Sequence, residues 1–238
     1  MEGRLVEQTR MRAAIARRMV ESKQQAPHFY VQTEVAVDGV QSRLAELNAH
    51  ANGGSPRTTM TAALVRACVA ALRGHPRLNA VWTRDGLLEA SEINIGIAIA
   101  LDDGLVAPAL LGAERLAAAE TAAALRDLAE RARAGRLRPA ELSEATFTLS
   151  NLGMFDVTAF TAIVTPPQVA ILATARPVER WITVDGEPAR RSLLTATLSA
   201  DHRALDGVDA ARFLETFKQA LEDASSLLAA PDVKEAMT

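Results

Sequence analysis

Hydrophobic side chains recur along the chain with two periods, one typical of helices and the other of strands. Residues 9–24 carry apolar side chains at every fourth position and stop before Pro27, which predicts an amphipathic helix. Residues 29–37 alternate between bulky and polar or small side chains, which is the period of a long strand. Asp38 follows and is expected to cap a second helix, whose apolar side chains are Val40, Leu44 and Leu47.

The middle of the chain predicts one more helix and several strands. Residues 52–56 contain two glycines and a proline and predict a loop, whereas the apolar run at 61–73 predicts a buried helix. A turn at Asp85-Gly86 predicts a hairpin of residues 80–83 and 87–90. A further strand is expected over residues 93–101. Its small face should admit a closely packed helix or a ligand, and consists of Asn94, Gly96, Ala98 and Ala100.

The C-terminal half mixes both kinds of element. An alanine-rich helix is expected at 116–134, with Gly135 as its C-terminal stop, and a last helix at about 208–223. Strands are predicted at residues 146–150, 169–175 and 193–200, together with a hairpin around Asp185-Gly186. Because no linker separates two cores, we expect a single α/β domain over residues 1–238, an α+β two-layer sandwich with a mixed sheet and flanking helices.

Composition and charge narrow the class of protein. The 238 residues are 49% hydrophobic and 23% charged, the balance of a globular domain. A formal net charge of −3 offers no basic field for nucleic acid or an anionic membrane. No segment approaches the ~20 apolar residues of a membrane span, and the N-terminus has no apolar signal region. Alanine and arginine are abundant and lysine is scarce, which indicates a GC-rich bacterial genome. The single cysteine, Cys68, fits a reducing compartment, so we expect the cytoplasm of a bacterium.

The reactive side chains exclude several chemistries. Cys68 is the single cysteine, so an internal disulfide is impossible, and its place in an apolar helical run predicts a small buried hydrophobe. The four histidines form no HExxH or other zinc-ligand spacing, so no metal is expected. A phosphate-binding P-loop and a GxGxxG fingerprint are also missing from the sequence.

The run at residues 201–207 reads Asp-His-Arg-Ala-Leu-Asp-Gly and carries the most specific chemistry. It places His202 and Asp206 four residues apart, just after the apolar run 193–198. An imidazole titrates near neutral pH, so it can take a proton from a thiol without being charged already. A strand end that opens into a loop is a common place for catalytic groups. The alternative for an isolated histidine is a structural or surface role.

The same run resembles the DHRxxDG signature of the dihydrolipoamide acyltransferases, which form the catalytic cores of 2-oxo-acid dehydrogenase complexes. Four further stretches resemble the family in kind and in order, so that the resemblance extends from about Arg12 to Leu228. They are residues 15–19 together with 27–29, residues 94–98, residues 146–153 and residues 165–168.

The resemblance implies a chloramphenicol-acetyltransferase-like fold and a homotrimer with active sites in channels between subunits. Coenzyme A would enter from one end and the dihydrolipoyl arm of a lipoyl domain from the other. His202 matches the general base, Asp206 the carboxylate of the HxxxD pattern, and Ser150 the hydroxyl that stabilises the oxyanion from the neighbouring chain. Relatives assemble further into cubic or dodecahedral cores that bind the other components of the complex.

Several side chains leave alternatives open. Ser150 could instead cap a turn before Asn151, and Asp206 is better interpreted as holding its loop and orienting His202 than as transferring protons. Arg203 is expected to be an ion-pair partner that fixes the fold. Arg18 falls on the apolar stripe of the first helix, which predicts a buried carboxylate partner, either Asp201 or Asp206.

The sequence also departs from the family. No lipoyl or peripheral-subunit-binding domain is present, which indicates an excised core or a protein that acts alone. Asp156 replaces a usual glycine near Ser150 and could reshape the acyl pocket. The tail at residues 229–238 carries charges where relatives end on an apolar tip, which argues against a larger cage.

Three functions follow from these observations. The first is transfer of an acyl group between dihydrolipoamide and coenzyme A, which Arg203 beside His202 favours. Residues 150–155 favour acetyl as the transferred group. The second is an acyltransferase with another small acceptor, favoured by the missing lipoyl domain. The third is a non-catalytic core scaffold, which the joint presence of His202, Asp206 and Ser150 disfavours.

Overall fold

The computed structural model describes residues 3–49 and 57–229. The loop predicted at residues 52–56 and residues 230–238 of the tail lie outside the described residues. The helices are α1 (Arg10–Gln25), α2 (Asp38–Ala49), α3 (Met60–Gly74), α4 (Ala118–Arg133), α5 (Pro139–Ser143), α6 (Gly207–Glu222), α7 (Ala224–Leu227) and the short 3-10 turns η1 (Pro76–Leu78) and η2 (Ala113–Arg115). The strands are β1 (His28–Ala36), β2 (Ala80–Thr83), β3 (Gly86–Glu89), β4 (Ile95–Ile97), β5 (Ile99–Leu101), β6 (Gly104–Val106), β7 (Ala109–Leu110), β8 (Phe147–Asn151), β9 (Ala170–Thr174), β10 (Val178–Val184) and β11 (Glu187–Asp201).

A mixed sheet forms the centre of the molecule. Its strand order is β1-β11-β9-β8-β4-β7, and β10 pairs with the first half of the long strand β11. The pairs β8–β9 and β4–β8 are parallel, whereas β1–β11, β11–β9 and β4–β7 are antiparallel. Two separate hairpins, β2–β3 and β5–β6, flank this sheet. The predicted mixed α/β fold is therefore confirmed.

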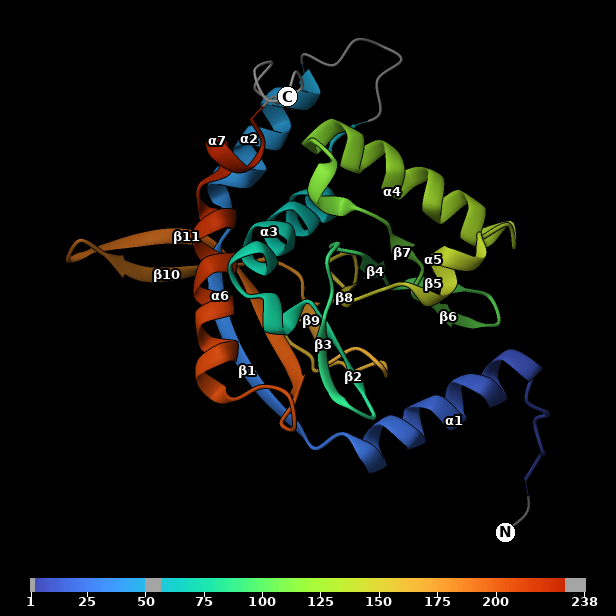
Figure 1. Ribbon diagram of the computed structural model, residues 1–238. Helices are drawn as coiled ribbons and strands as arrows, with labels where there is room; N and C mark the ends of the chain where they lie inside the picture. The colour runs from blue at the N-terminus through green and yellow to red at the C-terminus, as the bar shows by residue number, and fades with distance from the viewer. Residues whose placement is uncertain (1–2, 50–56, 230–238) are drawn as a thin grey trace, which may run out of the picture.

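Helices α3 and α6 lie side by side against the sheet, and α4 covers its β7 end (Figure 1). The core between these layers consists of branched and aromatic side chains, among which Phe147, Phe213 and Phe217 are fully buried. Cys68 lies in this core, which confirms its prediction as a small buried hydrophobe, and burial raises the pKa of its thiol. Among the described residues, no helix is both long and apolar enough to cross a bilayer.

The strand predicted over residues 93–101 is wrong as a single element. The chain leaves the central sheet after β4, and β5 pairs with β6 in a separate hairpin. At Gly96 the small face is filled by neither the expected helix nor a ligand, because a Cβ on Gly96 would lie 2.8 Å from Thr148 Oγ1 and 3.3 Å from Ala145 Cβ. Gly96 therefore lies against the neighbouring strand β8 and the residue Ala145 just before it.

One turn and one helix end follow the sequence closely. Gly135 adopts φ +65° just beyond α4, and Asp185 and Gly186 adopt φ 50° and 86° between β10 and β11. The expected capping role of Asp38 is not observed. Asp38 begins α2, but its carboxylate accepts hydrogen bonds from the Ser192 backbone N–H at 3.0 and 3.1 Å, which fastens α2 to β11.

Helix α1 forms as predicted but projects along the outside of the molecule (Figure 1). Ser22 is its one buried side chain among the described residues. Met11 and Ile15 lie over the β5–β6 turn, where a Cβ on Gly104 would contact both. Met11 is nevertheless 37% exposed and Val20 55% exposed, so the apolar stripe of α1 is only partly covered within one chain.

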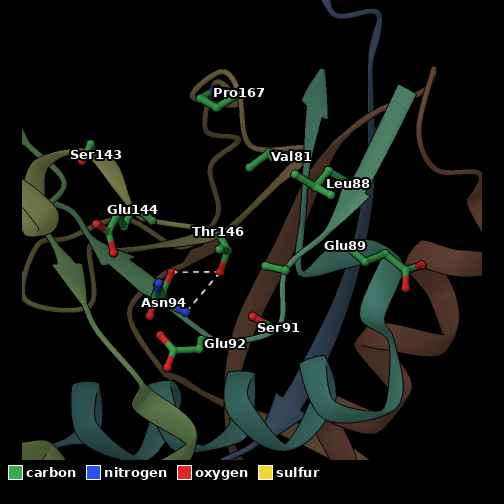
Figure 2. A pocket seen from close by; sticks show the side chains of 12 residues that line it. Val81, Leu88, Glu89, Ser91, Glu92, Asn94, Ser143, Glu144, Thr146 and Pro167 are labelled. Carbon is green, nitrogen blue, oxygen red and sulfur yellow. Dashed lines mark hydrogen bonds between the residues drawn. The ribbon is translucent and has the colours of Figure 1, made fainter. Parts of the chain in front are cut away.

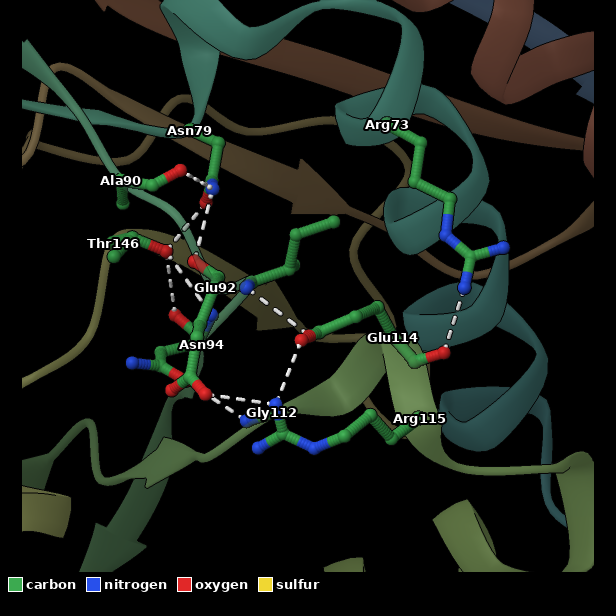
Figure 3. A network of polar contacts seen from close by, with 10 residues as sticks. Arg73, Asn79, Ala90, Glu92, Asn94, Gly112, Glu114, Arg115 and Thr146 are labelled. Carbon is green, nitrogen blue, oxygen red and sulfur yellow. Dashed lines mark hydrogen bonds and ion pairs between the residues drawn. The ribbon is translucent and has the colours of Figure 1, made fainter. Parts of the chain in front are cut away.

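A polar network fixes the start of β4, as Figure 3 shows. Asn94 accepts a hydrogen bond from the Gly112 N–H at 2.8 Å, and its own N–H donates to Thr146 Oγ1 at 3.1 Å. Thr146 in turn donates to Asn79 Oδ1 at 2.6 Å. Because Asn79, Asn94 and Thr146 are all buried, these bonds satisfy groups that would otherwise be costly to bury, and they hold β4 beside β8.

Candidate functional site

His202 lies in the turn that joins β11 to α6, immediately beyond the last residue of the strand. Its side chain is exposed, and its ring centroid lies 4.5 Å from that of Phe29 with the planes tilted by 44°. The His202 backbone N–H donates to the carbonyl of Pro27, the residue just before β1, at 2.9 Å, so this segment holds the turn from one side. Arg77 holds it from the other, donating to the Ala204 carbonyl at 2.7 Å. An accessible imidazole therefore sits on a firmly held backbone.

Asp201 and Arg203 flank this histidine and form the ion pair predicted for Arg203. The buried Asp201 carboxylate accepts from Arg203 Nη2 at 2.6 Å and from Nε at 3.0 and 3.1 Å. The guanidinium also lies over the Trp82 ring, 4.9 Å from its centroid. This pair raises the pKa of Arg203 through its hydrogen bonds to Asp201, and it secures the loop in the way expected of a fold-fixing residue.

The predicted partner for Arg18 is wrong. Arg18 is exposed and lines the rim of a cavity of about 310 Å³ that also contains Asp201 and Arg203. Within residues 3–49 and 57–229, Arg18 makes no ion pair, because the Asp201 carboxylate is occupied by Arg203 and Asp206 by backbone donors. The prediction of a buried carboxylate for Arg18 failed because it required the apolar stripe of α1 to face the core.

Asp206 is the N-cap of α6. Its Oδ1 accepts from the Val208 N–H at 2.8 Å and from the Asp209 N–H at 3.0 Å. The Asp209 carboxylate accepts reciprocally from the Asp206 N–H, which completes a capping box. The hydrogen bonds from Asp209 and Val208 lower the pKa of the Asp206 carboxyl. Asp206 thus holds the loop as predicted, by fixing the point where it enters the helix.

Ser150 lies far from His202 within one chain. Ser150 is half-buried near the C-terminal end of β8 and pairs with Ala173 of β9, which pairs with Thr197 of β11. His202 follows the C-terminal end of β11, which lies at the edge of the sheet opposite to Ser150. The five residues from Thr197 to His202 span about 17 Å along β11, and the two strand spacings from β8 to β11 span about 10 Å across the sheet. The backbones of Ser150 and His202 are therefore about 20 Å apart. No hydrogen-bonded site that joins them can form within one subunit.

The segment after Ser150 is exposed and apolar. Met154 and Phe155 are 69% and 56% exposed, which is unusual for large hydrophobic side chains on one short turn. Asp156 follows them with its carboxylate in solvent and accepts from Arg176 Nη2 at 2.7 Å. The charge at Asp156 is therefore paired on the surface of the subunit.

A second cavity lies away from these residues. It measures about 460 Å³ and opens between β3, the 91–94 segment and the end of α5, as Figure 2 shows. Its lining mixes acidic and polar side chains with apolar ones, and His202, Ser150 and Asp206 are not among its residues. This cavity is therefore separate from the turn around His202.

Sequence reasoning missed the residues that hold His202 in place. These residues are Pro27 just before β1, Phe29 in β1 and Arg77 in η1, all distant from the turn in sequence. The motif at residues 27–29 was part of the family resemblance, yet its contact with the turn follows from a register that pairs His28 with Asp201. The contact of Arg77 with the turn could not be predicted from the sequence, because a single arginine after a proline occurs in many structural settings.

A family model described as 2-oxoacid dehydrogenases acyltransferase (catalytic domain) matches residues 2–229. The chain belongs to this family. The acyltransferase chain is 35% identical, over 92% of its length, to the dihydrolipoyllysine-residue acetyltransferase component of the pyruvate dehydrogenase complex from Zymomonas mobilis. It is 38% identical to the corresponding mitochondrial protein from Schizosaccharomyces pombe over 90% of its length. It spans about half of each relative, 50% and 44% respectively.

Solved structures agree with this assignment. A probable dihydrolipoamide acetyltransferase from Listeria monocytogenes is 32% identical with a TM-score of 0.91, covering 96% of this chain and 98% of that one. The cubic core of a pyruvate dehydrogenase multienzyme complex is 29% identical, also with a TM-score of 0.91, covering 96% and 95%. Chloramphenicol acetyltransferase is 14% identical with a TM-score of 0.55 over 87% and 93%, which confirms the predicted fold alone.

One solved relative bears on the site. The dihydrolipoamide acetyltransferase of Azotobacter vinelandii, 29% identical over 96% of this chain and 95% of that one at a TM-score of 0.91, was studied for the roles of a serine, a histidine and an asparagine in its catalytic mechanism. These three residues follow one another along that chain at the same intervals as Ser150, His202 and Asp206 here. The acyltransferase chain therefore carries an aspartate at the interval of the asparagine.

Proposed function

We propose that this domain transfers an acetyl group between dihydrolipoamide and coenzyme A. The observation that carries the proposal is the exposed imidazole of His202 on a backbone fastened at Pro27, Ala204 and Asp206, in a chain of the acyltransferase family. Acetyl is chosen because the Zymomonas and Schizosaccharomyces relatives are acetyltransferase components. Coenzyme A and the dihydrolipoyl group are the two substrates, and the chemistry requires no metal.

The reaction exchanges one thioester for another. His202 takes the proton from the attacking thiol, and the resulting thiolate adds to the thioester carbonyl to form a tetrahedral oxyanion. Ser150 donates a hydrogen bond to that oxyanion, an interaction worth roughly 3 kcal/mol in comparable acyl-transfer sites. The intermediate collapses by breaking the original carbon–sulfur bond, and His202 returns the proton to the departing sulfur. One thiol is consumed and one is released, so the step needs no energy source.

The site requires two copies of the chain. Because Ser150 and His202 start about 20 Å apart in one subunit, a common oxyanion site must combine His202 of one copy with Ser150 of a neighbour. The exposed Met154 and Phe155 beside Ser150 support a second copy against that end of β8. A homotrimer with one site at each interface satisfies this requirement. Residues 1–238 would then act as one catalytic domain in each subunit.

The proposal extends to partners and assembly. The curated relatives are about twice as long as this chain, so we assign the dihydrolipoyl group to a lipoyl domain outside residues 1–238. The other components of a 2-oxo-acid dehydrogenase complex are the expected partners, and a bacterial cytoplasm is the expected compartment. Leu227 and Leu228 are 9% and 2% exposed and belong to the core of their own subunit. Because they offer no protruding apolar tip, we propose a trimer and not a cubic or dodecahedral cage.

A coupled assay tests the proposal. Free dihydrolipoamide is offered with a panel of acetyl-, propionyl-, succinyl- and branched-chain acyl-coenzyme A, and thioester formation is followed. We expect the highest kcat/KM with acetyl-coenzyme A. Activity with other thiols or amines but none with dihydrolipoamide would favour an acyltransferase with another acceptor, and no transfer to any acceptor would favour a scaffold. His75→Gln serves as a control because His75 bonds Thr216, away from the turn.

A further inference from the structure

His28 is the side chain that joins the two segments around the reactive turn. Its Nδ1 lies 2.7 Å from the Ala26 carbonyl oxygen, and its Nε2 lies 3.0 Å from the Val164 backbone nitrogen. A carbonyl oxygen only accepts and a backbone N–H only donates. The imidazole must therefore carry its proton on Nδ1 and accept at Nε2, which is possible only for the neutral ring in one tautomer.

Val164 is held on both sides by the same segment. Its N–H donates to His28, and its carbonyl accepts from the buried Ser22 hydroxyl at 2.6 Å. Val164 is itself fully buried. Ser22 and His28 therefore hold one residue, Val164, of the loop that follows β8, and both contacts are long-range in sequence.

The clamped loop reaches the residues beside His202. Three positions after Val164, the Pro167 carbonyl accepts from the Trp82 N–H at 2.7 Å. The Trp82 ring in turn lies under the Arg203 guanidinium. The Asp201 N–H donates to the Val169 carbonyl at 2.9 Å. On its other side, the strand of His28 supports the reactive turn through the Pro27 carbonyl and the Phe29 ring. Contacts from residues 27–29 on one side and from the loop at residues 164–169 on the other therefore surround the His202 turn, and His28 links the two.

We propose that His28 is a positioning residue for acyl transfer. It fixes the distance between the strand that supports His202 and the loop at residues 164–169, without touching the reacting atoms. This inference rests on the proposed function, because it assumes that His202 carries the proton transfer. Displacing a catalytic group by about 1 Å can cost roughly 100-fold in rate, so loss of the Val164 bond lowers kcat more than it changes substrate affinity.

A matched pair of substitutions separates the two bonds of the imidazole. In His28→Gln the amide oxygen can take the place of Nε2 and accept from Val164, whereas in His28→Asn the amide nitrogen can take the place of Nδ1 and donate to Ala26. Each variant keeps one bond and loses one. A purely structural role would therefore lower the unfolding temperature and the activity of both variants alike.

The experiment measures kcat and KM for acetyl transfer to dihydrolipoamide with the full chain, with light scattering and thermal unfolding as checks on assembly and folding. We expect His28→Asn to lose roughly 10- to 100-fold in kcat with KM within about twofold, and His28→Gln to stay within about threefold of wild type. Equal losses in both variants, or wild-type kcat in His28→Asn, would overturn the proposal.

Ser22→Ala gives an independent measurement if His28→Asn fails to fold. It removes the second bond on Val164 and leaves the imidazole in place. We expect a loss of kcat at unchanged KM, and a wild-type kcat overturns the inference. Failure of the proposed function is distinguishable, because wild-type protein would then show no transfer, or His202→Ala would retain it.

Discussion

Mixed oligomers of two inactive variants provide a quantitative test of a site shared between subunits. One variant, Ser150→Ala, keeps His202, and the other, His202→Ala, keeps Ser150. Removing an oxyanion donor costs about 100- to 1000-fold in kcat, and removing a general base costs at least about 100-fold. Each variant alone should therefore retain at most about 1% of wild-type activity.

The expected recovery follows from the geometry of a ring of three. In a cyclic trimer every interface pairs one face of a subunit with the opposite face of the next. Any trimer that contains both variants then has a single interface where an intact His202 meets an intact Ser150. Purified mixed trimers should recover about one third of the wild-type activity.

The assay uses co-expression of the two variants with different affinity tags and purification over both tags in sequence. Trimers of a single variant carrying both tags are the control and should stay at the level of that variant. If the mixed trimers are no more active than the two parents, the separation of about 20 Å between Ser150 and His202 is not bridged by a neighbouring subunit and the shared site is refuted.

Three further predictions concern stability and assembly. Asp206→Ala should lose about 1 kcal/mol of unfolding free energy through the lost cap, whereas Asp206→Asn should keep both the stability and most of kcat; a large loss of kcat in the asparagine variant would indicate more than a capping role. Glu141 is buried, and its bonds to Arg131 lower the pKa of its carboxyl to about 2. Glu141→Gln should cost about 2 kcal/mol at pH 7 by urea unfolding. Because the folded pKa is the lower one, this contribution is present above pH ~4.5 and should fade between there and pH 2, and a constant difference over that range would contradict it. Light scattering should give a mass of three chains of 25.4 kDa, and the mass of a cage would refute the inference from Leu227 and Leu228.

Local periodicity predicted most helices and strands because each buries one face in a single core. Residues 29–37 and 193–200 became β1 and β11, and the helix at 208–223 became α6 within one residue at each end. The strand at 93–101 failed because alternation does not reveal where a chain leaves one sheet for another. Helix α5 was missed because its five residues are too few to show a period.

The candidate site was predictable only in part. The run at residues 201–207 identified His202 and Asp206, because a histidine and a helix cap leave a local pattern. The contacts of Phe29 and Arg77 depend on how distant strands pair, which no local pattern records. Arg18 was misassigned because a stripe of apolar residues on α1 does not show whether the core or a neighbouring subunit covers it.

The central claim is that His202 supplies the proton transfer for acetyl exchange between dihydrolipoamide and coenzyme A. The most direct measurement is kcat for this reaction in wild type, His202→Ala and the control His75→Gln at neutral pH, with circular dichroism and light scattering to verify folding and assembly. The account predicts a loss of at least about 100-fold in His202→Ala and wild-type activity in His75→Gln. A folded His202→Ala variant with near-normal kcat would contradict it.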